Sequence, residues 1–282
     1  MPDVDVPLID AHMHLQEEVL EGHVERVVER ARMVGVHFLA CNGTHPGDWD
    51  RTLELARTYR GIVPCLGLHP WFIDGRPPGW LERLADLTRA GHACVGEAGL
   101  DALSPGAGVG AQLEVLLPQL ELAKELRRPA MIHCVRAFGH LLAALTEVGP
   151  LPAGFLLHSY AGPPDLVPQF ARLGAVFSFG GNVLDERHKR ARRSLASVPE
   201  NRLLVETDAP ALLPPPDFRT HVLRGDAGRL WNEPANLPAI LRGIAALRGT
   251  PPEDLARLVW RNAQRLLGDL LWKTDGSPES SR

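Results

Sequence analysis

The sequence alternates eight times between a short apolar run and a longer stretch with helical periodicity. The first run opens at Leu8 and Ile9, and the others cover residues 36–41, 61–68, 93–97, 130–133, 154–158, 175–179 and 202–206. The intervening predicted helices cover residues 22–34, 48–58, 79–90, 111–126, 137–148, 165–173 and 185–197. Parallel strands need crossover helices, and closing a sheet removes its exposed edges. The alternation therefore predicts an α/β fold, a TIM (β/α)8 barrel.

The length suits a single barrel domain. The chain has 282 residues, and such barrels typically have roughly 250. We expect one domain over residues 1–270 and a polar C-terminal tail over residues 271–282. Residues 234–247, 252–259 and 261–267 predict three further helices, and residues 209–233 form the longest irregular connection, expected over the mouth of the barrel. The alternative is an open doubly wound sheet, but no glycine-rich phosphate fingerprint follows the first run.

Charge and cysteine usage narrow the choice of partners and compartment. The formal net charge of −4 gives no overall positive field that would attract nucleic acid, although it does not exclude a nuclease. Each cysteine ends an apolar run, which predicts reduced core thiols in a cytoplasmic protein. We see no secretory signal and no apolar segment near the roughly 20 residues that span a bilayer. We expect a cytoplasmic protein with no membrane association and no obligate protein partner.

Two histidines, His12 and His14, end the first apolar run. Side chains alternate faces along a strand, so these two point the same way and are able to share a metal ion. Taken alone, the pair fits equally well a hydrogen-bonded core residue and a rim residue. Its meaning depends on whether other strands supply further ligands.

Ligand-type side chains end most of the other predicted strands. They are His69 at the end of the third strand, Glu97 at the end of the fourth, His133 of the fifth, His158 of the sixth and Asp208 of the eighth. The C-terminal ends of barrel strands meet at one mouth, so residues far apart in sequence become neighbours there. Any one of them is explained as a rim histidine or a helix cap, but their joint placement favours a site. Histidines and carboxylates suit two divalent ions, Zn²⁺, Mn²⁺ or Mg²⁺, with Glu97 as the natural bridge.

Short motifs around these residues resemble the TatD-like metal-dependent hydrolases of the amidohydrolase barrel superfamily. The motifs are Ile9-Asp10-Ala11-His12-Met13-His14, Gly67-Leu68-His69-Pro70, Gly96-Glu97-Ala98-Gly99-Leu100-Asp101, Met131-Ile132-His133, His158-Ser159-Tyr160-Ala161-Gly162, Glu206-Thr207-Asp208-Ala209-Pro210 and Asn232-Glu233-Pro234. They occur in the family's order, and the resemblance runs from about residue 8 to residue 268.

The resemblance also implies roles for these residues. It implies that His12, His14 and Asp208 bind one metal ion, that His133 and His158 bind a second, and that Glu97 bridges the two. Asp208 would also take the proton of the attacking water, which makes Asp208 and Glu97 the catalytic pair. His69 would contact a substrate phosphate or leaving oxygen, and the Asn232-Glu233-Pro234 motif would buttress the mouth.

The sequence departs from the family where substrate contacts are expected. The family's arginine near the fifth strand is shifted by one position to Arg136, residues 102–110 form a small Gly/Pro-rich loop, and Ala211 replaces a larger residue. Trp71, followed by Phe72, is the best aromatic substrate contact at the mouth; otherwise it packs in a lid. A basic run at residues 187–193 is explained either as a solvated helix face or, with the arginines of residues 209–233, as a phosphate-binding surface.

The resemblance favours a divalent-metal-dependent phosphodiesterase that acts on nucleic-acid ends as a deoxyribonuclease, with 3′-5′ exonuclease character and DNA preferred over RNA. A first alternative keeps the site but attacks a carboxyl ester or amide, as a D-aminoacyl-tRNA deacylase does. A second alternative is a barrel scaffold without catalysis. The fold alone does not choose among them, because barrels host many chemistries.

Overall fold

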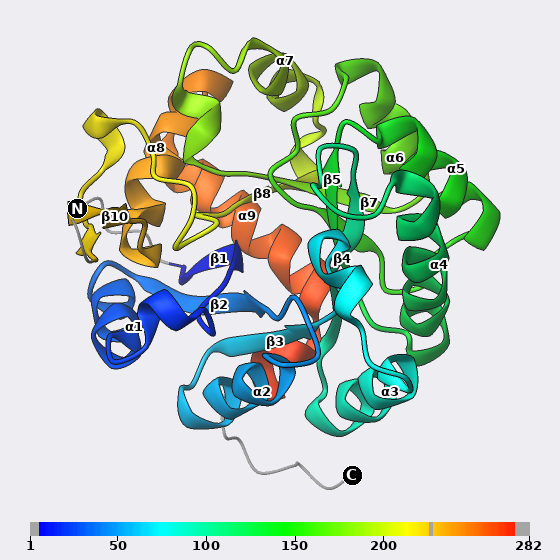
Figure 1. The fold of residues 1–282 in the computed structure, drawn as a ribbon. Coiled ribbons are helices and arrows are strands. Elements are labelled where there is room, and N and C mark those ends of the chain that lie inside the picture. The colour runs from blue at the N-terminus through cyan, green and yellow to red at the C-terminus, as the bar shows by residue number, and fades with distance from the viewer. Residues whose placement is uncertain (1–5, 226–227, 274–282) are drawn as a thin grey trace, which may run out of the picture.

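The computed structural model describes residues 6–225 and 228–273, which form a barrel of eight parallel strands inside a ring of helices (Figure 1). The strands pair in the order of the sequence. They are β1 (Leu8–Met13), β2 (Val36–Asn42), β3 (Ile62–Leu66), β4 (Cys94–Asp101), β5 (Ala130–Val135), β6 (Phe155–Leu157), β7 (Ala175–Phe179) and β8 (Leu203–Val205). The predicted TIM-barrel fold is confirmed.

The barrel closes where the chain leaves β8 and meets the end of β1. The Asp208 backbone N–H donates to the His12 carbonyl at 3.0 Å, and the His14 N–H donates to the Ala209 carbonyl at 2.7 Å. These two bonds bring the first and last ligand-bearing segments side by side. They explain why residues almost two hundred positions apart share one mouth.

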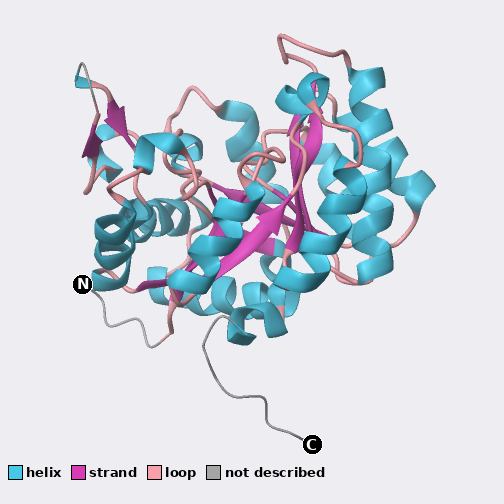
Figure 2. Ribbon diagram, turned by 60° about the horizontal axis from the view of Figure 1, so that its bottom comes forward, coloured by secondary structure: helices cyan, strands magenta, loops and turns pink. Residues whose placement is uncertain are grey.

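The helices cover the outer face of the strands, which lie at the centre of the molecule (Figure 2). They are α1 (Val24–Met33), α2 (Trp49–Thr58), α3 (Trp80–Gly91), α4 (Val109–Leu126), α5 (Phe138–Val148), α6 (Val167–Arg172), α7 (Lys189–Ser197), α8 (Leu237–Arg248), α9 (Pro252–Leu267) and α10 (Asp269–Lys273). In α1 the buried residues are Val24, Val27, Val28 and Ala31. Their spacing of three and four residues is that of one helix face packed on a core.

Three predicted boundaries were wrong for identifiable reasons. Residues 252–259 and 261–267 form the single helix α9, because Trp260 is buried against Phe38 at a ring distance of 5.3 Å and the helix runs through it. Helix α7 starts at Lys189 rather than near 185, because the Asp185 carboxylate accepts from the Arg187 N–H and guanidinium and holds a turn. Residues 209–233 contain a small antiparallel pair, β9 (Leu223–Arg224) and β10 (Leu230–Trp231).

The C-terminal end packs on the barrel further than its polar composition indicated. Leu270 and Leu271, the second of which lies in the predicted tail, are buried in the hydrophobic core. Residues 274–282 lie outside the described part of the chain, so the division into a domain and a tail stays a prediction. Among the described residues, no helix combines the length and apolar character needed to cross a membrane.

Candidate metal centre

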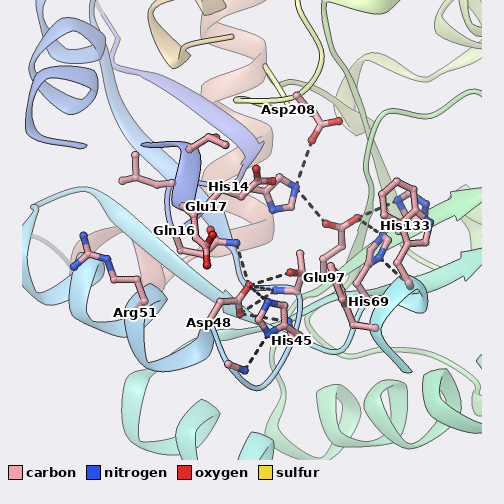
Figure 3. Close-up of a pocket in the computed structure, with 18 of the residues that line it drawn as sticks. His14, Gln16, Glu17, His45, Asp48, Arg51, His69, Glu97, His133 and Asp208 are labelled. Atoms are coloured by element: carbon pink, nitrogen blue, oxygen red, sulfur yellow. Dashed lines mark hydrogen bonds and ion pairs between the residues drawn. The ribbon is translucent and has the colours of Figure 1, made fainter. Parts of the chain in front are cut away.

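A cavity of about 670 Å³ opens at the mouth where the strands end, and most of the predicted site residues line it (Figure 3). The lining includes His14, His69, Glu97, His133, His158 and Asp208. His12 is fully buried next to these residues and does not itself line the cavity. The barrel thus brings together every predicted ligand, and we call these seven residues the floor of the site.

The first group of donor atoms surrounds one oxygen of Glu97. Its Oε2 lies 3.3 Å from His12 Nε2 and 3.4 Å from His14 Nε2, and the two imidazole nitrogens are 3.3 Å apart. Asp208 Oδ1 lies 3.5 Å from His14 Nε2 and 3.9 Å from His12 Nε2. Four ligands placed tetrahedrally about 2.1 Å from an ion lie about 3.4 Å from one another. The separations of 3.3–3.9 Å are close to that value, so this donor set fits a divalent ion.

A second group surrounds the other oxygen of Glu97. Its Oε1 lies 3.0 Å from His133 Nδ1 and 2.9 Å from His158 Nε2, and these nitrogens are 3.0 Å apart. Neighbouring ligands of an octahedral ion at about 2.1 Å lie about 3.0 Å apart. Three atoms in mutual contact cannot all be joined by hydrogen bonds, because each ring nitrogen has one hydrogen or one lone pair in the ring plane. A cation contacts all three at once, so this donor set also fits a divalent ion.

His69 lies beside the second group but presents an N–H group to it, not a lone pair. Its Nδ1 accepts the Trp71 backbone N–H at 3.2 Å, so in the neutral ring the proton is on Nε2, which lies 3.5 Å from Glu97 Oε1. Burial lowers the pKa of His69 to about 3, with the neighbouring imidazoles adding to the effect. The neutral ring therefore offers an N–H donor, rather than a metal-binding lone pair, towards the cavity.

Mutual charge stabilisation keeps both carboxylates of the floor ionised. Burial opposes ionisation of Glu97, but the imidazoles of His158, His69 and His12 hold its pKa well below its usual range. Burial acts against Asp208 as well, and contact with His14 nevertheless lowers its pKa to about 2. The centre therefore supplies two anionic ligands at neutral pH.

The histidine pKa values of the floor are displaced in both directions. Burial would lower the pKa of His14, but Asp208 and Glu97 raise it to about 9. Burial likewise opposes protonation of His158, whose pKa Glu97 and Glu206 raise well above its usual value. The pKa of His12, which is buried and stacked on His158 at a ring distance of 3.8 Å, is lowered. Without a metal ion, positive charge at the floor is thus carried by protons.

Neighbouring groups orient the ligand rings. The Nδ1–H of His14 donates to the Asn42 carbonyl at 2.8 Å, which leaves the lone pair of Nε2 for a metal ion. Asp101 Oδ2 lies 3.5 Å from His133 Nε2 and accepts the Trp71 indole N–H at 2.7 Å. Asp101 therefore links a ligand of the second group to the aromatic rim. The sequence motif ending at Asp101 was noticed, but this link was not predicted.

Glu206 faces the far side of His158. Its Oε1 and the His158 Nδ1 are buried, lack hydrogen-bond partners among the described residues, and lie 3.8 Å apart. The other oxygen, Oε2, accepts a hydrogen bond from the Ser178 hydroxyl. A carboxylate behind a ligating imidazole fixes its tautomer and direction, and Glu206 is placed for that role.

The segment that carries Asp208 is held from two sides. The Asp10 carboxylate accepts both the backbone N–H and the hydroxyl of Thr207, and Asn232 donates to the Thr207 and Leu212 carbonyls at 2.8 Å each. Asp208 itself has a left-handed backbone, with φ of 53°. The Asn232-Glu233-Pro234 motif therefore supports the mouth, as the sequence indicated, and Glu233 pairs with Arg30 at 2.8 Å.

Exposed residues around the cavity form a rim of mixed chemistry. The segment after β1 contributes three carboxylates, those of Glu17, Glu18 and Glu21. The segment after β3 contributes Trp71 and Phe72, whose side chains are 57% and 41% exposed. The rim is thus acidic beside β1 and aromatic beside β3.

A short loop after β2 adds His45 and Asp48 to the rim, next to Arg51 at the start of α2 (Figure 3). His45 packs on Phe72 at a ring distance of 4.9 Å. Asp48 stands at the N-cap position of α2, but its carboxylate accepts from the Thr44 and His45 backbone N–H groups instead of capping the helix. Sequence reasoning missed the acidic and His45 parts of the rim, and the only available signal was their position directly after a strand.

Arg136 and the arginines of residues 209–233 do not line this cavity. Arg136 has a left-handed backbone, with φ of 51°, and lines a separate cavity. In residues 209–233, Arg219 donates to the Pro214 carbonyl and Arg229 stacks on Trp231 at 3.9 Å. Arg136 therefore belongs to a cavity other than that of the metal centre.

Comparison with known proteins places these features in a family context. The sequence model of the family described as "TatD related DNase" matches residues 9–268. A 3′-5′ ssDNA/RNA exonuclease of Dickeya dadantii is 34% identical over 92% of this chain and 97% of its own length. A metal-dependent hydrolase of Bacillus subtilis is 29% identical over 92% of this chain and 98% of its own. The crystal structure of a TatD homologue from Escherichia coli superposes with a TM-score of 0.83 at 27% identity, covering 92% and 97% of the two chains.

Proposed function

The chain belongs to the TatD-related DNase family, and from that membership we propose that it is a phosphodiesterase that trims nucleic-acid ends with two divalent metal ions. One observation carries the proposal. The two oxygens of Glu97 each face a separate group of imidazole nitrogens, at 2.9–3.5 Å. A single carboxylate shared by two donor groups is the arrangement that holds a pair of ions for hydrolysis of a phosphate ester.

We assign the ligands as the sequence indicated. His12, His14 and Asp208 would hold one ion, His133 and His158 the other, and Glu97 both. The mixed nitrogen and oxygen donors suit Zn²⁺ or Mn²⁺, and Mg²⁺ is the alternative. When bound, such a pair activates water and neutralises charge on the phosphoryl oxygens.

The protein side chains would handle the proton and the substrate. Asp208 is ionised at neutral pH and borders the cavity, so it can accept the proton of an attacking water. His69 would donate its Nε2–H to a substrate oxygen, since its Nδ1 is engaged by the Trp71 backbone. Catalysis would then depend on Asp208 and Glu97 at the floor.

The rim supports action on an end rather than within a long strand. Trp71 and Phe72 offer exposed ring faces on which a base can stack. The carboxylates of Glu17, Glu18 and Glu21 would repel a second arm of the phosphate backbone. A strand would therefore leave the cavity away from its acidic side. All four cysteines are free thiols, the state expected in the reducing cytoplasm in which we propose the protein works.

A panel of end-labelled substrates tests the proposal. Metal-free protein should be inactive, and adding Mn²⁺, Zn²⁺ or Mg²⁺ should restore stepwise shortening of single-stranded DNA labelled at its 5′ end. RNA labelled in the same way would show whether DNA is preferred. A Glu97→Ala variant that digests DNA as well as wild type would contradict the proposal. Glu147→Gln, an exposed carboxylate of α5, is the matched control.

The acidic rim also favours a second candidate. Glu17, Glu18 and Glu21 suit the cationic amino group of an aminoacyl ester better than they suit a polyanion. Hydrolysis of aminoacyl-tRNA by metal-loaded protein that leaves DNA intact would select this candidate. Turnover of neither compound, together with no stoichiometric metal after gentle purification, would select the scaffold alternative.

A further inference from the structure

Two basic features that the metal centre does not use come together at a second cavity. Arg136, just after β5, and Arg190, on α7, both line a cavity of about 500 Å³. Phe138, Gly139, Pro163 and Leu166 complete its lining, so the cavity has no acidic residue. It shares no lining residue with the cavity of the metal centre.

The two guanidinium groups have their hydrogen-bonding capacity available. Within residues 6–225 and 228–273, the side chains of Arg136 and Arg190 form no hydrogen bond or ion pair, and both residues are exposed. Neighbouring arginines differ, because Arg187 pairs with Asp185 at 2.6 Å and Arg192 donates to the Val183 carbonyl at 3.2 Å. Within the basic run, Arg190 is thus the residue that brings an unpaired guanidinium to this cavity.

The lining of the second cavity packs against the segment that follows His158. Tyr160 packs on Phe138 at a ring distance of 5.3 Å, and its hydroxyl donates to the Pro163 carbonyl at 2.9 Å. On α7, the Ser194 hydroxyl donates to the Gly162 carbonyl at 2.7 Å. These contacts hold α7, and with it Arg190, against the same loop that begins at a floor histidine.

The second cavity also lies close to the metal centre along the chain. Arg136 follows His133 by three residues, so their Cα atoms are at most about 11 Å apart. Successive phosphates of an extended single strand are separated by distances of the same order. A strand whose end lies in the metal cavity can therefore reach Arg136 within a few nucleotides.

We propose that the cavity between Arg136 and Arg190 binds the sugar-phosphate backbone of a single-stranded nucleic acid whose end occupies the metal centre. This rests on the proposed phosphodiesterase function. Arginine recognises phosphate through paired N–H groups, and two unpaired guanidiniums across an apolar floor suit a phosphate with its sugar or base. The site anchors the strand, and the metal centre acts on its end.

Binding of a non-hydrolysable strand tests the anchor directly. We would measure the fluorescence anisotropy of a phosphorothioate oligonucleotide of about 12 nucleotides, a length within the usual site sizes, with metal-loaded protein at several salt concentrations. The Arg136→Ala/Arg190→Ala variant should bind at least about tenfold more weakly than wild type. Its salt slope should fall by about 1.4, because each neutralised phosphate of a single strand contributes about 0.7.

Matched variants separate the anchor from general charge and from catalysis. Arg57→Ala/Arg172→Ala removes two exposed arginines at the last turns of α2 and α6 and should leave affinity and slope unchanged. Arg136→Lys/Arg190→Lys should keep most of the salt slope. Hydrolysis of bis(p-nitrophenyl) phosphate, which is too small to reach both sites, should be equal in wild type and the alanine variant.

Two outcomes would overturn the anchor. One is an unchanged affinity and slope in the double alanine variant, and the other is an equal loss in the Arg57→Ala/Arg172→Ala control. Failure of the proposed function looks different. It would appear as no hydrolysis of any phosphodiester by the metal-loaded wild type, whatever the two arginines contribute to binding.

Discussion

The floor and the rim of the metal cavity are built in different ways. The floor residues Glu97 and His158 are 2% and 8% exposed; Glu97 lies within β4, and His158 directly follows β6. The rim residues Trp71 and Phe72 are 57% and 41% exposed and lie in a short 3-10 segment. The floor is cross-linked by contacts around one carboxylate, whereas the rim joins separate connecting segments.

This difference indicates how the chemistry is divided. The barrel fixes the floor, so a change there alters the ions and the reaction itself. The rim is held by few contacts, among them the Trp71–Asp101 bond of 2.7 Å, so a change there alters which substrate is held. Floor variants should therefore affect all substrates equally, and rim variants should affect large substrates alone.

The largest effect is expected at the shared carboxylate. Glu97→Gln removes the charge that both donor groups surround, so kcat/KM should fall by about a thousandfold or more on every substrate. The assay compares bis(p-nitrophenyl) phosphate with an oligonucleotide. If the variant loses only oligonucleotide turnover, Glu97 acts on substrate binding and not on the reaction itself, which would contradict its assignment to the floor.

A smaller floor effect is expected behind His158. Glu206→Gln removes the negative charge that faces the His158 Nδ1. The substitution should lower the affinity for one of the two ions by about tenfold to a hundredfold. Competition with a chromophoric chelator measures both binding steps. Ser178→Ala should show the same change to a lesser degree, and equal affinities in all three proteins would exclude a positioning role.

The pH dependence of metal binding sharpens the account of the floor. The pKa of His14 is raised to about 9 in the metal-free protein, so below that pH an ion must displace a proton. Apparent affinity should rise as the pH rises towards 9. The same raised pKa stabilises the metal-free fold fully below the ordinary value of 6.5, and this stabilisation is lost as pH rises through about 9.

Calorimetry in buffers of different ionisation enthalpy would measure these protons. We expect net proton release on ion binding at pH 7, smaller release above pH 9, and a reduced value for His14→Ala. An affinity that is independent of pH between 6.5 and 9 would show that His14 is neutral in the metal-free floor.

The smallest effect is expected at the rim. Trp71→Ala removes one stacking surface, worth about 1–3 kcal/mol for a bound base, and should raise KM for an oligonucleotide without changing the rate on bis(p-nitrophenyl) phosphate. Trp71→Phe should retain most of the affinity. A parallel loss on the small diester would mean that Trp71 acts on the floor through Asp101 and His133.

The floor was easier to predict from the sequence than the rim, because the floor residues lie on or directly after barrel strands and the rim residues lie in loops. The floor was predictable because strand ends are recognisable and a barrel gathers them at one mouth, so His12 and Asp208 were expected to meet. In the rim only Trp71 and Phe72 were expected at the mouth; its acidic and His45 parts were not, because loop conformation decides which atoms face the cavity. Asp48 reads as a helix cap, yet the preceding loop uses its carboxylate, and only the fold reveals this.

The same reasoning explains the misplaced arginine. The family resemblance implied that Arg136 is shifted by one residue, but not where its side chain lies. Arg136 has a left-handed backbone and lines one cavity with Arg190, which is over fifty residues away along the chain. Their proximity depends on how α7 packs against the loop after β6.

Metal stoichiometry tests the central claim, that Glu97 unites two ion-binding groups, most directly. Elemental analysis of the protein dialysed against limiting free Mn²⁺ or Zn²⁺ should give two ions per wild-type chain. His12→Ala and His158→Ala should each retain one ion, and Glu97→Gln should weaken both sites. A wild-type chain that binds one ion or none, or a Glu97→Gln chain that keeps two with unchanged affinity, would contradict the account.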